Sequence, residues 1–202
     1  ETIYVSGSDE NIYALDTADG SERWSVETGE DVRPSPVVAD GAVYVGNDDG
    51  TLYALNVEDG TELWSVELNT PILGAVAVAD GIVFVASENQ GLFAFDAADG
   101  SPVWQYPMES PEFLSPVVVD GAVYIGDYQG LYAVNIEDRS ERWTEDIEDD
   151  VRALAALADG VVYALDETGT VTAFDAADGT EQFQIAPETG ASISSSPTVS
   201  EG

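Results

Sequence analysis

An aromatic residue returns at nearly constant spacing along the whole chain. Its five positions are separated by 40, 40, 39 and 40 residues: Trp24, Trp64, Trp104, Trp143 and Phe183. A period in this range is typical of repeat architectures, in which one unit cannot bury its apolar face without its neighbours. The spacing therefore predicts an array of five similar units that fold together as a single domain over residues 1–202.

Each unit contains four short segments with the composition of β-strands. In the second unit they are residues 36–39, 43–46, 52–55 and 62–66, separated by turns rich in Asp, Asn and Gly. Short β-branched and aromatic runs bounded by such turns indicate hairpins. A four-stranded unit of about 40 residues predicts one blade of a β-propeller, so we expect an all-β fold of antiparallel blades. The predicted repeats are residues 1–40, 41–80, 81–120, 121–159 and 160–202.

The two ends of the sequence are in complementary phase within the repeat. The chain opens on a second strand, residues 3–5, and its last strand, residues 197–199, has the sequence of a first strand. A first strand from the C-terminus could complete the N-terminal blade and remove the free edges of the ring. We therefore expect five blades closed by the C-terminal strand; a cut from a longer propeller is the alternative.

The charge balance is extreme. Forty Asp and Glu face five basic residues, all Arg, which gives a formal net charge of −35. Such a chain repels itself in ordinary buffer, but the Debye length falls to about 3 Å in molar salt. The composition thus indicates a protein from a salt-loving organism, and it argues against nucleic-acid binding, which needs clustered Lys and Arg.

Other classes of protein are excluded by simple counts. The chain has no Cys and no His, so it offers no disulfide, no Ser-His-Asp triad and no ordinary zinc site. No stretch reaches the roughly 18 apolar residues of a membrane span. The chain also lacks an initiator Met and a signal peptide, from which we expect a processed product or a cut piece of a longer protein whose targeting segment has been removed. We expect a domain of an exported or cell-surface protein of a halophile.

Each unit carries the pattern Ala-x-Asp-x-x-Asp-Gly-x-x-x-Trp or a close variant, complete at residues 14–24 and again at residues 94–104. This pattern resembles the tryptophan-docking motif of the pyrroloquinoline-quinone (PQQ)-like propeller repeat family. The resemblance implies that each indole packs on the Gly peptide of the next blade and that its N–H meets a main-chain carbonyl. The fourth unit has Arg139 in place of this Gly, and the fifth has Phe183 in place of Trp, so weaker docking is expected there.

The resemblance also implies two kinds of function. Quinoprotein dehydrogenases of the family hold PQQ and calcium over the channel and use longer chains with more blades. Other relatives are non-catalytic scaffolds in assembly complexes or parts of sensors. Because this chain has no long insertion and no unique cluster of acids, we expect a non-enzymatic binding or scaffold domain without a cofactor. A fragment of a quinoprotein dehydrogenase is the alternative.

The turns differ between the two faces of the predicted ring. Those after the first and third strands are nearly identical in every unit, as expected where Asp caps the backbone and Gly supplies positive φ. Those after the second strand vary, and one of them carries Tyr128. Paired carboxylates such as Asp48 and Asp49 could ligate calcium, but acidic turns in a halophile are more often a hydrated surface, so no metal site is predicted.

One register position on the variable face holds two of the five cations. It reads Arg33, Leu73, Phe113, Arg152 and Ser194 through the five units. Guanidinium groups at a channel mouth could bind an anion or a carboxylate of a small molecule or protein partner. The alternative is that each Arg pairs with a nearby Asp. The candidate ligand-binding residues are therefore Arg33, Arg152, Phe113 and Tyr128, with no catalytic residue predicted.

Overall fold

The structure is a computed structural model that describes residues 1–108, 115–127, 130–147, 151–154 and 160–187. All regular elements in these ranges are β-strands, and they form five antiparallel sheets. The first sheet has three strands: β1 (Thr2–Ser6), β2 (Asn11–Asp16) and β3 (Glu22–Glu27). The second has four: β4 (Val37–Ala39), β5 (Ala42–Gly46), β6 (Thr51–Asn56) and β7 (Glu62–Glu67).

The remaining three sheets repeat the four-stranded plan. The third consists of β8 (Ala77–Ala79), β9 (Ile82–Ser87), β10 (Gly91–Asp96) and β11 (Pro102–Tyr106). The fourth consists of β12 (Val117–Val119), β13 (Ala122–Gly126), β14 (Gly130–Asn135) and β15 (Glu141–Asp146). The fifth consists of β16 (Val151–Leu154), β17 (Val161–Asp166), β18 (Val171–Asp175) and β19 (Glu181–Ile185). In every sheet the strand order follows the chain.

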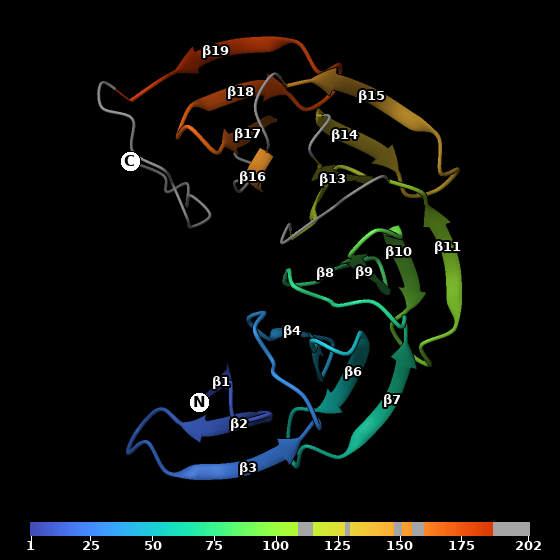
Figure 1. Ribbon diagram of the computed structural model, residues 1–202. Helices are drawn as coiled ribbons and strands as arrows, with labels where there is room; N and C mark the ends of the chain where they lie inside the picture. The colour runs from blue at the N-terminus through green and yellow to red at the C-terminus, as the bar shows by residue number, and fades with distance from the viewer. Residues whose placement is uncertain (109–114, 128–129, 148–150, 155–159, 188–202) are drawn as a thin grey trace.

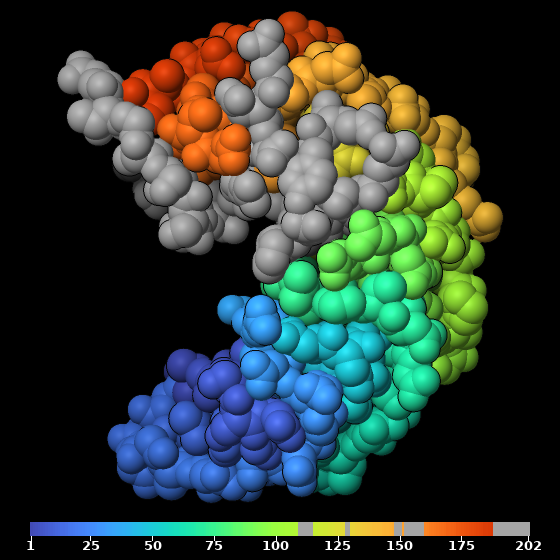
Figure 2. Space-filling view, viewed as in Figure 1, coloured from blue at the N-terminus to red at the C-terminus, as the bar shows by residue number. Residues whose placement is uncertain are grey.

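The five sheets stand side by side around an arc (Figure 1). The short strands β4, β8 and β16 lie on its inner side, and the long strands β3, β7, β11, β15 and β19 form its outer rim. The space-filling view shows the same curved body, with the first sheet at one end and the fifth sheet toward the other (Figure 2). The predicted propeller fold is thus confirmed, whereas the described strands do not close into a ring.

In the second, third and fourth sheets the hairpin between the first two strands has a two-residue turn. In the second sheet Ala39 pairs with Ala42, and both intervening residues have positive φ, 48° at Asp40 and 83° at Gly41. This is the requirement of the type I′ turn, which matches the twist of the flanking strands. The sequence analysis assigned positive φ to the Gly of this turn; the structure also places Asp40 in the left-handed region, which Asp tolerates better than most residues.

A β-bulge sets the position of each docking aromatic. In the second sheet Ala54 pairs with Trp64, and the register then shifts before Leu55 pairs with Glu62. The same shift follows the Ala–aromatic pair in the other four sheets. Because a bulge bends the outer strand and adds twist, it fixes the direction in which the aromatic side chain leaves the sheet.

The core lies between consecutive sheets rather than within one. Side chains of a second strand alternate, so that Val43 packs with residues of the first sheet and Tyr44 with residues of the second and third. Both are buried. Each sheet therefore needs a neighbour on either side to cover its apolar residues, as the repeat period predicts.

The predicted closing strand, residues 197–199, lies outside the described residues. Among the residues that the structure describes, β1 pairs only with β2, so the first sheet lacks the inner strand that the other four possess. Five blades closed by the C-terminal strand therefore stays a prediction.

Candidate functional site

Backbone hydrogen bonds define two faces of the arc. On one face the segments that link one sheet to the next meet the turns after the second strands. Asp48 N donates to Asp31 O at 3.0 Å, and Glu88 N donates to Pro71 O at 3.1 Å. We call this the loop face. On the opposite face the turns after the first and third strands meet, as in the bond from Val57 N to Gly41 O at 3.2 Å.

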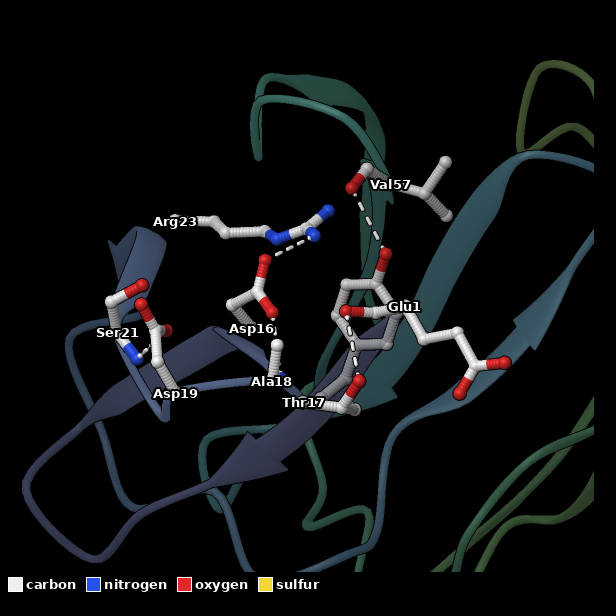
Figure 3. Close-up of polar contacts among 9 residues, drawn as sticks. Glu1, Asp16, Thr17, Ala18, Asp19, Ser21, Arg23 and Val57 are labelled. Carbon is white, nitrogen blue, oxygen red and sulfur yellow. Dashed lines mark hydrogen bonds and ion pairs between the residues drawn. The ribbon is translucent and has the colours of Figure 1, made fainter.

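The turns of the opposite face use their carboxylates internally. In the first sheet Asp16 accepts a hydrogen bond from Ala18 N at 2.8 Å and pairs with Arg23, while Asp19 accepts from Ser21 N at 2.9 Å (Figure 3). Bonds from the backbone and then from neighbouring side chains hold the pKa of both carboxyls below the usual range. In the later turns the pKa is lowered by hydrogen bonds from the Thr or Ser two residues on, at Asp59, Asp99, Asp138 and Asp178. Because these carboxylates are hydrogen-bonded within their own turns, we take the loop face as the candidate binding surface.

Arg33 is the candidate residue that the structure places in full. It lies in the link between β3 and β4, its guanidinium is 2.7 Å from Asp48 Oδ2, and its side chain is 58% exposed. The pair joins the link of one sheet to the turn of the next. One carboxylate thus occupies only part of the guanidinium, and the exposed remainder keeps donors that can reach a partner.

The other three candidates are placed less completely. Arg152 lies within β16, on the inner side of the arc, and its side chain falls outside the described part. Phe113 and Tyr128 lie outside the described residues. The structure therefore places the backbones of the two Arg residues, and the grouping of the four candidates stays a prediction.

In four sheets a buried polar residue stands at the end of the blade's second strand or directly after it, and the sequence analysis did not predict it. The residues are Asn47, Ser87, Asp127 and Asp166. Asn47 Oδ1 accepts a hydrogen bond from Thr51 N at 2.8 Å, and Asp166 Oδ1 accepts one from Thr170 N at 2.8 Å. Through these bonds the buried side chains hold the turns of the loop face in place. A polar residue that recurs where the apolar run of the second strand ends was the available signal.

Two tyrosines lie between the third and fourth sheets. The rings of Tyr106 and Tyr132 are 6.3 Å apart, and the Tyr106 hydroxyl donates to Glu141 Oε2 at 2.7 Å. Burial, followed by the nearby Asp127 carboxylate, raises the pKa of Tyr132 to about 12. Burial and the bond to Glu141 also raise the pKa of Tyr106. Both groups are neutral at physiological pH and hold the two sheets together as hydrogen-bond donors and packed rings.

Three of the predicted docking aromatics contact the following sheet in the same way. Trp24, Trp64 and Trp143 donate from Nε1 to the carbonyls of Val57, Ala97 and Ala176 at 3.1, 3.0 and 3.0 Å. Each indole lies on a Gly, so close that a Cβ there would come within 3 Å of it: Gly60, Gly100 and Gly179. The contribution of these contacts to stability stays a prediction.

Trp104 and Phe183 differ from this arrangement. Trp104 is buried, but its Nε1 has no hydrogen-bond partner among the described residues. Its turn partner is Arg139, which has φ 64° and carries the Cβ that Gly lacks. Phe183 is 42% exposed on β19. The docking contacts therefore differ from the common arrangement at the same two places where the sequence departs from the motif.

The described residues do not form a metal centre. No group of three or more His, Cys, Asp or Glu converges within the described part of the chain. Calcium takes six to eight oxygens, and within the described residues no cluster of three carboxylates is present to supply part of them. No helix of the described part is long and apolar enough to span a membrane.

The comparison with protein families agrees with this geometry. The family described as outer membrane protein assembly factor BamB matches residues 8–116 and 111–201. The chain belongs to this family of PQQ-like propeller repeats. The predicted family is therefore confirmed. No curated protein matches the chain.

The matched proteins of known structure share this fold and are longer than this chain. BamB from Moraxella catarrhalis is 22% identical, with a TM-score of 0.78 over 92% of this chain and 61% of that one. The computationally designed Ika8 protein is 20% identical, with a TM-score of 0.82 over 91% and 58%. The quinohemoprotein alcohol dehydrogenase ADHIIG from Pseudomonas putida HK5 is 21% identical, with a TM-score of 0.77 over 92% and 40%. The BamB-type chain thus spans about three fifths of the first two proteins.

Proposed function

We propose that this BamB-type propeller is a non-enzymatic scaffold that binds a protein or small-molecule partner through its loop face. The observation that carries the proposal is the Arg33–Asp48 pair, which holds an exposed guanidinium at the junction of two sheets. Asp19, Asp59 and Asp99 of the opposite face accept hydrogen bonds within their own turns, which leaves them less available to a partner. The family's description as an assembly factor supports a scaffold rather than a catalyst.

The net charge limits how such a partner is recognised. At −35 the chain would attract cations indiscriminately in dilute buffer, but in molar salt charges beyond about 3 Å are screened. Recognition then relies on short-range contacts such as a bidentate guanidinium bond to a carboxylate. We propose that the acidic surface adapts the domain to high salt, with a location at or outside the cell surface.

The binding role is tested by retention of partners on the immobilised chain. Extract from the cells that produce the protein is passed over it in molar KCl, with the wild type compared with Arg33→Ala. Glu58→Ala, an exposed change on the opposite face, is the matched control. We expect Arg33→Ala to lose a retained component that Glu58→Ala keeps. Equal retention by both variants would contradict binding at Arg33.

The enzymatic alternative is a part of a quinoprotein dehydrogenase. It is supported by the fold likeness to the quinohemoprotein alcohol dehydrogenase alone. Thermal unfolding in molar KCl, with and without PQQ and Ca²⁺, separates the two functions. The scaffold predicts an unchanged melting temperature, because the described residues do not converge on a cation. A rise of several degrees with both ligands, absent with Ca²⁺ alone, would favour the dehydrogenase.

A further inference from the structure

The fifth sheet departs from the repeat at its third strand. In each sheet one residue stands directly before the Ala that pairs with the docking aromatic. In the first four sheets this residue is itself aromatic: Tyr13, Tyr53, Phe93 and Tyr132. In the fifth sheet it is Thr172, which is buried and pairs with Gln184. A ring that recurs in four sheets is therefore missing from the fifth.

At the earlier interfaces this ring packs against the preceding sheet. Tyr53 lies in the same apolar cluster as Val26, and its hydroxyl donates to Thr28 O at 3.1 Å. The ring of Tyr132 lies 6.3 Å from the ring of Tyr106. Val26 and Tyr106 both stand two residues after the docking aromatic of their own sheet. The ring and that residue thus form a contact that repeats from sheet to sheet.

Both members of this contact are replaced at the interface between the fourth and fifth sheets. Glu145 stands two residues after Trp143, where the other sheets have an apolar or aromatic residue, and Thr172 takes the place of the ring. A cavity of about 450 Å³ lies here and is lined by both side chains. Phe174 lines it as well, and its ring lies 6.3 Å from the ring of Trp143. Sites for small ligands commonly measure about 300–1,000 Å³, so the space is large enough for a ligand.

The cavity lies beside the loop face and has a polar wall. Asp166 and Thr170, which belong to the loop-face turn of the fifth sheet, line it. Its other polar lining residues are Glu145, Asp146, Glu181 and Gln184, and no Arg is among the described residues around it. The carboxylate of Glu145 is partly buried and has no hydrogen-bond or ionic partner among the described residues. A carboxylate held in this way favours a positively charged occupant.

The cavity suits an organic cation better than a metal ion. Within the described part of the chain, no three carboxylates converge as metal ligands do. A guanidinium group is flat like the ring that it would replace, stacks on aromatic faces and forms two parallel hydrogen bonds to one carboxylate. These bonds act at contact distance, so they persist in molar salt, where charges beyond about 3 Å are screened. An ammonium is instead a strongly hydrated point charge, which competes with the K⁺ of the same medium.

We propose that this cavity receives the arginine side chain of a protein partner. The guanidinium would pair with Glu145 and lie against Phe174, in the place that an aromatic ring takes in the other sheets. Asp166 contributes less, because its Oδ1 already accepts a hydrogen bond from Thr170 N at 2.8 Å. The site rests on the proposed binding function and adds to it a second contact at the loop face and the chemistry of the partner.

Binding of a single arginine tests the site directly. N-acetyl-arginine amide is titrated into the isotope-labelled chain in molar KCl and followed by NMR, with N-acetyl-citrulline amide as a neutral probe of the same shape. We expect saturable shifts near Thr172 with the arginine probe and at least about tenfold weaker binding of the citrulline probe. Absence of a saturable response would mean that the cavity holds only water and salt ions and would overturn the proposal. Equal binding of the two probes would overturn it as well.

Two carboxylate variants locate the bound guanidinium. Glu145→Gln keeps the shape of the side chain but removes its charge, so it should weaken binding of the arginine probe by at least about tenfold. Glu67→Gln, an exposed change at the loop-face end of β7, is the matched control and should bind the probe as the wild type does. If the two variants bind the probe equally, Glu145 is not its partner and the proposal fails.

Thr172→Tyr restores the repeat and should close the cavity. We expect it to abolish binding of the arginine probe while the melting temperature stays equal to that of the wild type or rises, since three other sheets have tyrosine at this position. A large drop in melting temperature would show that the chain itself already fills the space and would contradict the proposal. Continued binding of the probe would place it elsewhere, with the same consequence.

Retention of partners separates this site from Arg33. On the immobilised chain, Glu145→Gln should lose a component of the cell extract that Glu67→Gln keeps. If the probe binds but Glu145→Gln retains every component that the wild type retains, the cavity takes a free guanidinium compound and the protein partner is refuted. Arg33→Ala should bind the arginine probe as well as the wild type does. Failure of binding at Arg33 and failure at the cavity are therefore seen in different measurements.

Discussion

The interface between the second and third sheets and the interface between the third and fourth differ at one turn position. Trp64 lies on Gly100 and its N–H donates to Ala97 O at 3.0 Å. Trp104, in the equivalent place, faces a turn with Arg139, and its N–H has no partner among the described residues. We attribute the lost bond to the Arg139 Cβ, since a Cβ on Gly100 would lie 2.7 Å from the indole of Trp64. Gly in this motif therefore serves close packing as well as positive φ.

The weaker interface has a compensating contact. The Tyr106 hydroxyl on β11 donates to Glu141 on β15 at 2.7 Å and so joins the third and fourth sheets at their outer strands. The second and third sheets have Val66 and Pro102 at the equivalent positions, which cannot form this bond. Two adjacent interfaces of one repeat protein are thus held by different contacts, and we expect single substitutions to give one interface the properties of the other.

The largest expected effect comes from giving the stronger interface the residue of the weaker one. Gly100→Arg should destabilise the chain by about 2–4 kcal/mol, because it adds both left-handed strain and overlap with Trp64. Gly20→Arg is the matched control: it has nearly the same φ but an open neighbourhood, so only the strain of about 1–2 kcal/mol applies. Urea unfolding in molar KCl measures both. Equal losses would show that the indole contact contributes nothing.

Removing the indole N–H should affect the two interfaces differently. Trp64→Phe loses a buried hydrogen bond and should cost about 1 kcal/mol more than Trp104→Phe, whose N–H is unpaired among the described residues. The loss of ring area is common to both variants and cancels in the comparison. Free energies of unfolding decide the matter, and the idea fails if the Trp104 variant loses as much as the Trp64 variant.

Alkaline pH should weaken the interface between the third and fourth sheets. The pKa of Tyr132 is raised to about 12, so the folded state favours the neutral phenol. Its contribution is complete below about pH 10, the ordinary value, and is lost as the pH rises toward 12 because the unfolded chain ionises first. The drop in melting temperature between about pH 9 and 11 should be smaller in Tyr132→Phe than in the wild type. An identical drop would contradict the assignment.

High salt should raise the stability of the chain, and the increase should not depend on which interface is intact. With a net charge of −35, screening of repulsion predicts a strong increase of the unfolding midpoint from about 0.1 M to 3 M KCl. The Gly100→Arg variant should show the same increase, because its loss is steric. A flat response of the wild type would refute the high-salt adaptation.

The repeat allowed much of the fold to be predicted from sequence. The strands expected at residues 43–46 and 62–66 appear as β5 (Ala42–Gly46) and β7 (Glu62–Glu67), because β-branched runs between Asp-Gly turns leave few alternatives. Arg139 and Phe183 were also recognised as departures from the motif. The ionic partner of Arg33 could not be chosen, because forty carboxylates were available and only the fold brings Asp48 to it.

Arg139→Gly tests most directly whether the contact between indole and glycine holds the sheets together, since it restores the motif at the weaker interface. It should stabilise the chain by about 1–3 kcal/mol in urea unfolding, by removing left-handed strain and allowing the Trp104 N–H to pair with the turn carbonyl of Ile136. Arg139→Asn separates the two causes, because Asn tolerates positive φ but keeps the Cβ, and it should recover only part of the gain. If Arg139→Gly is neutral or destabilising, the contact between indole and glycine does not govern how these sheets hold together.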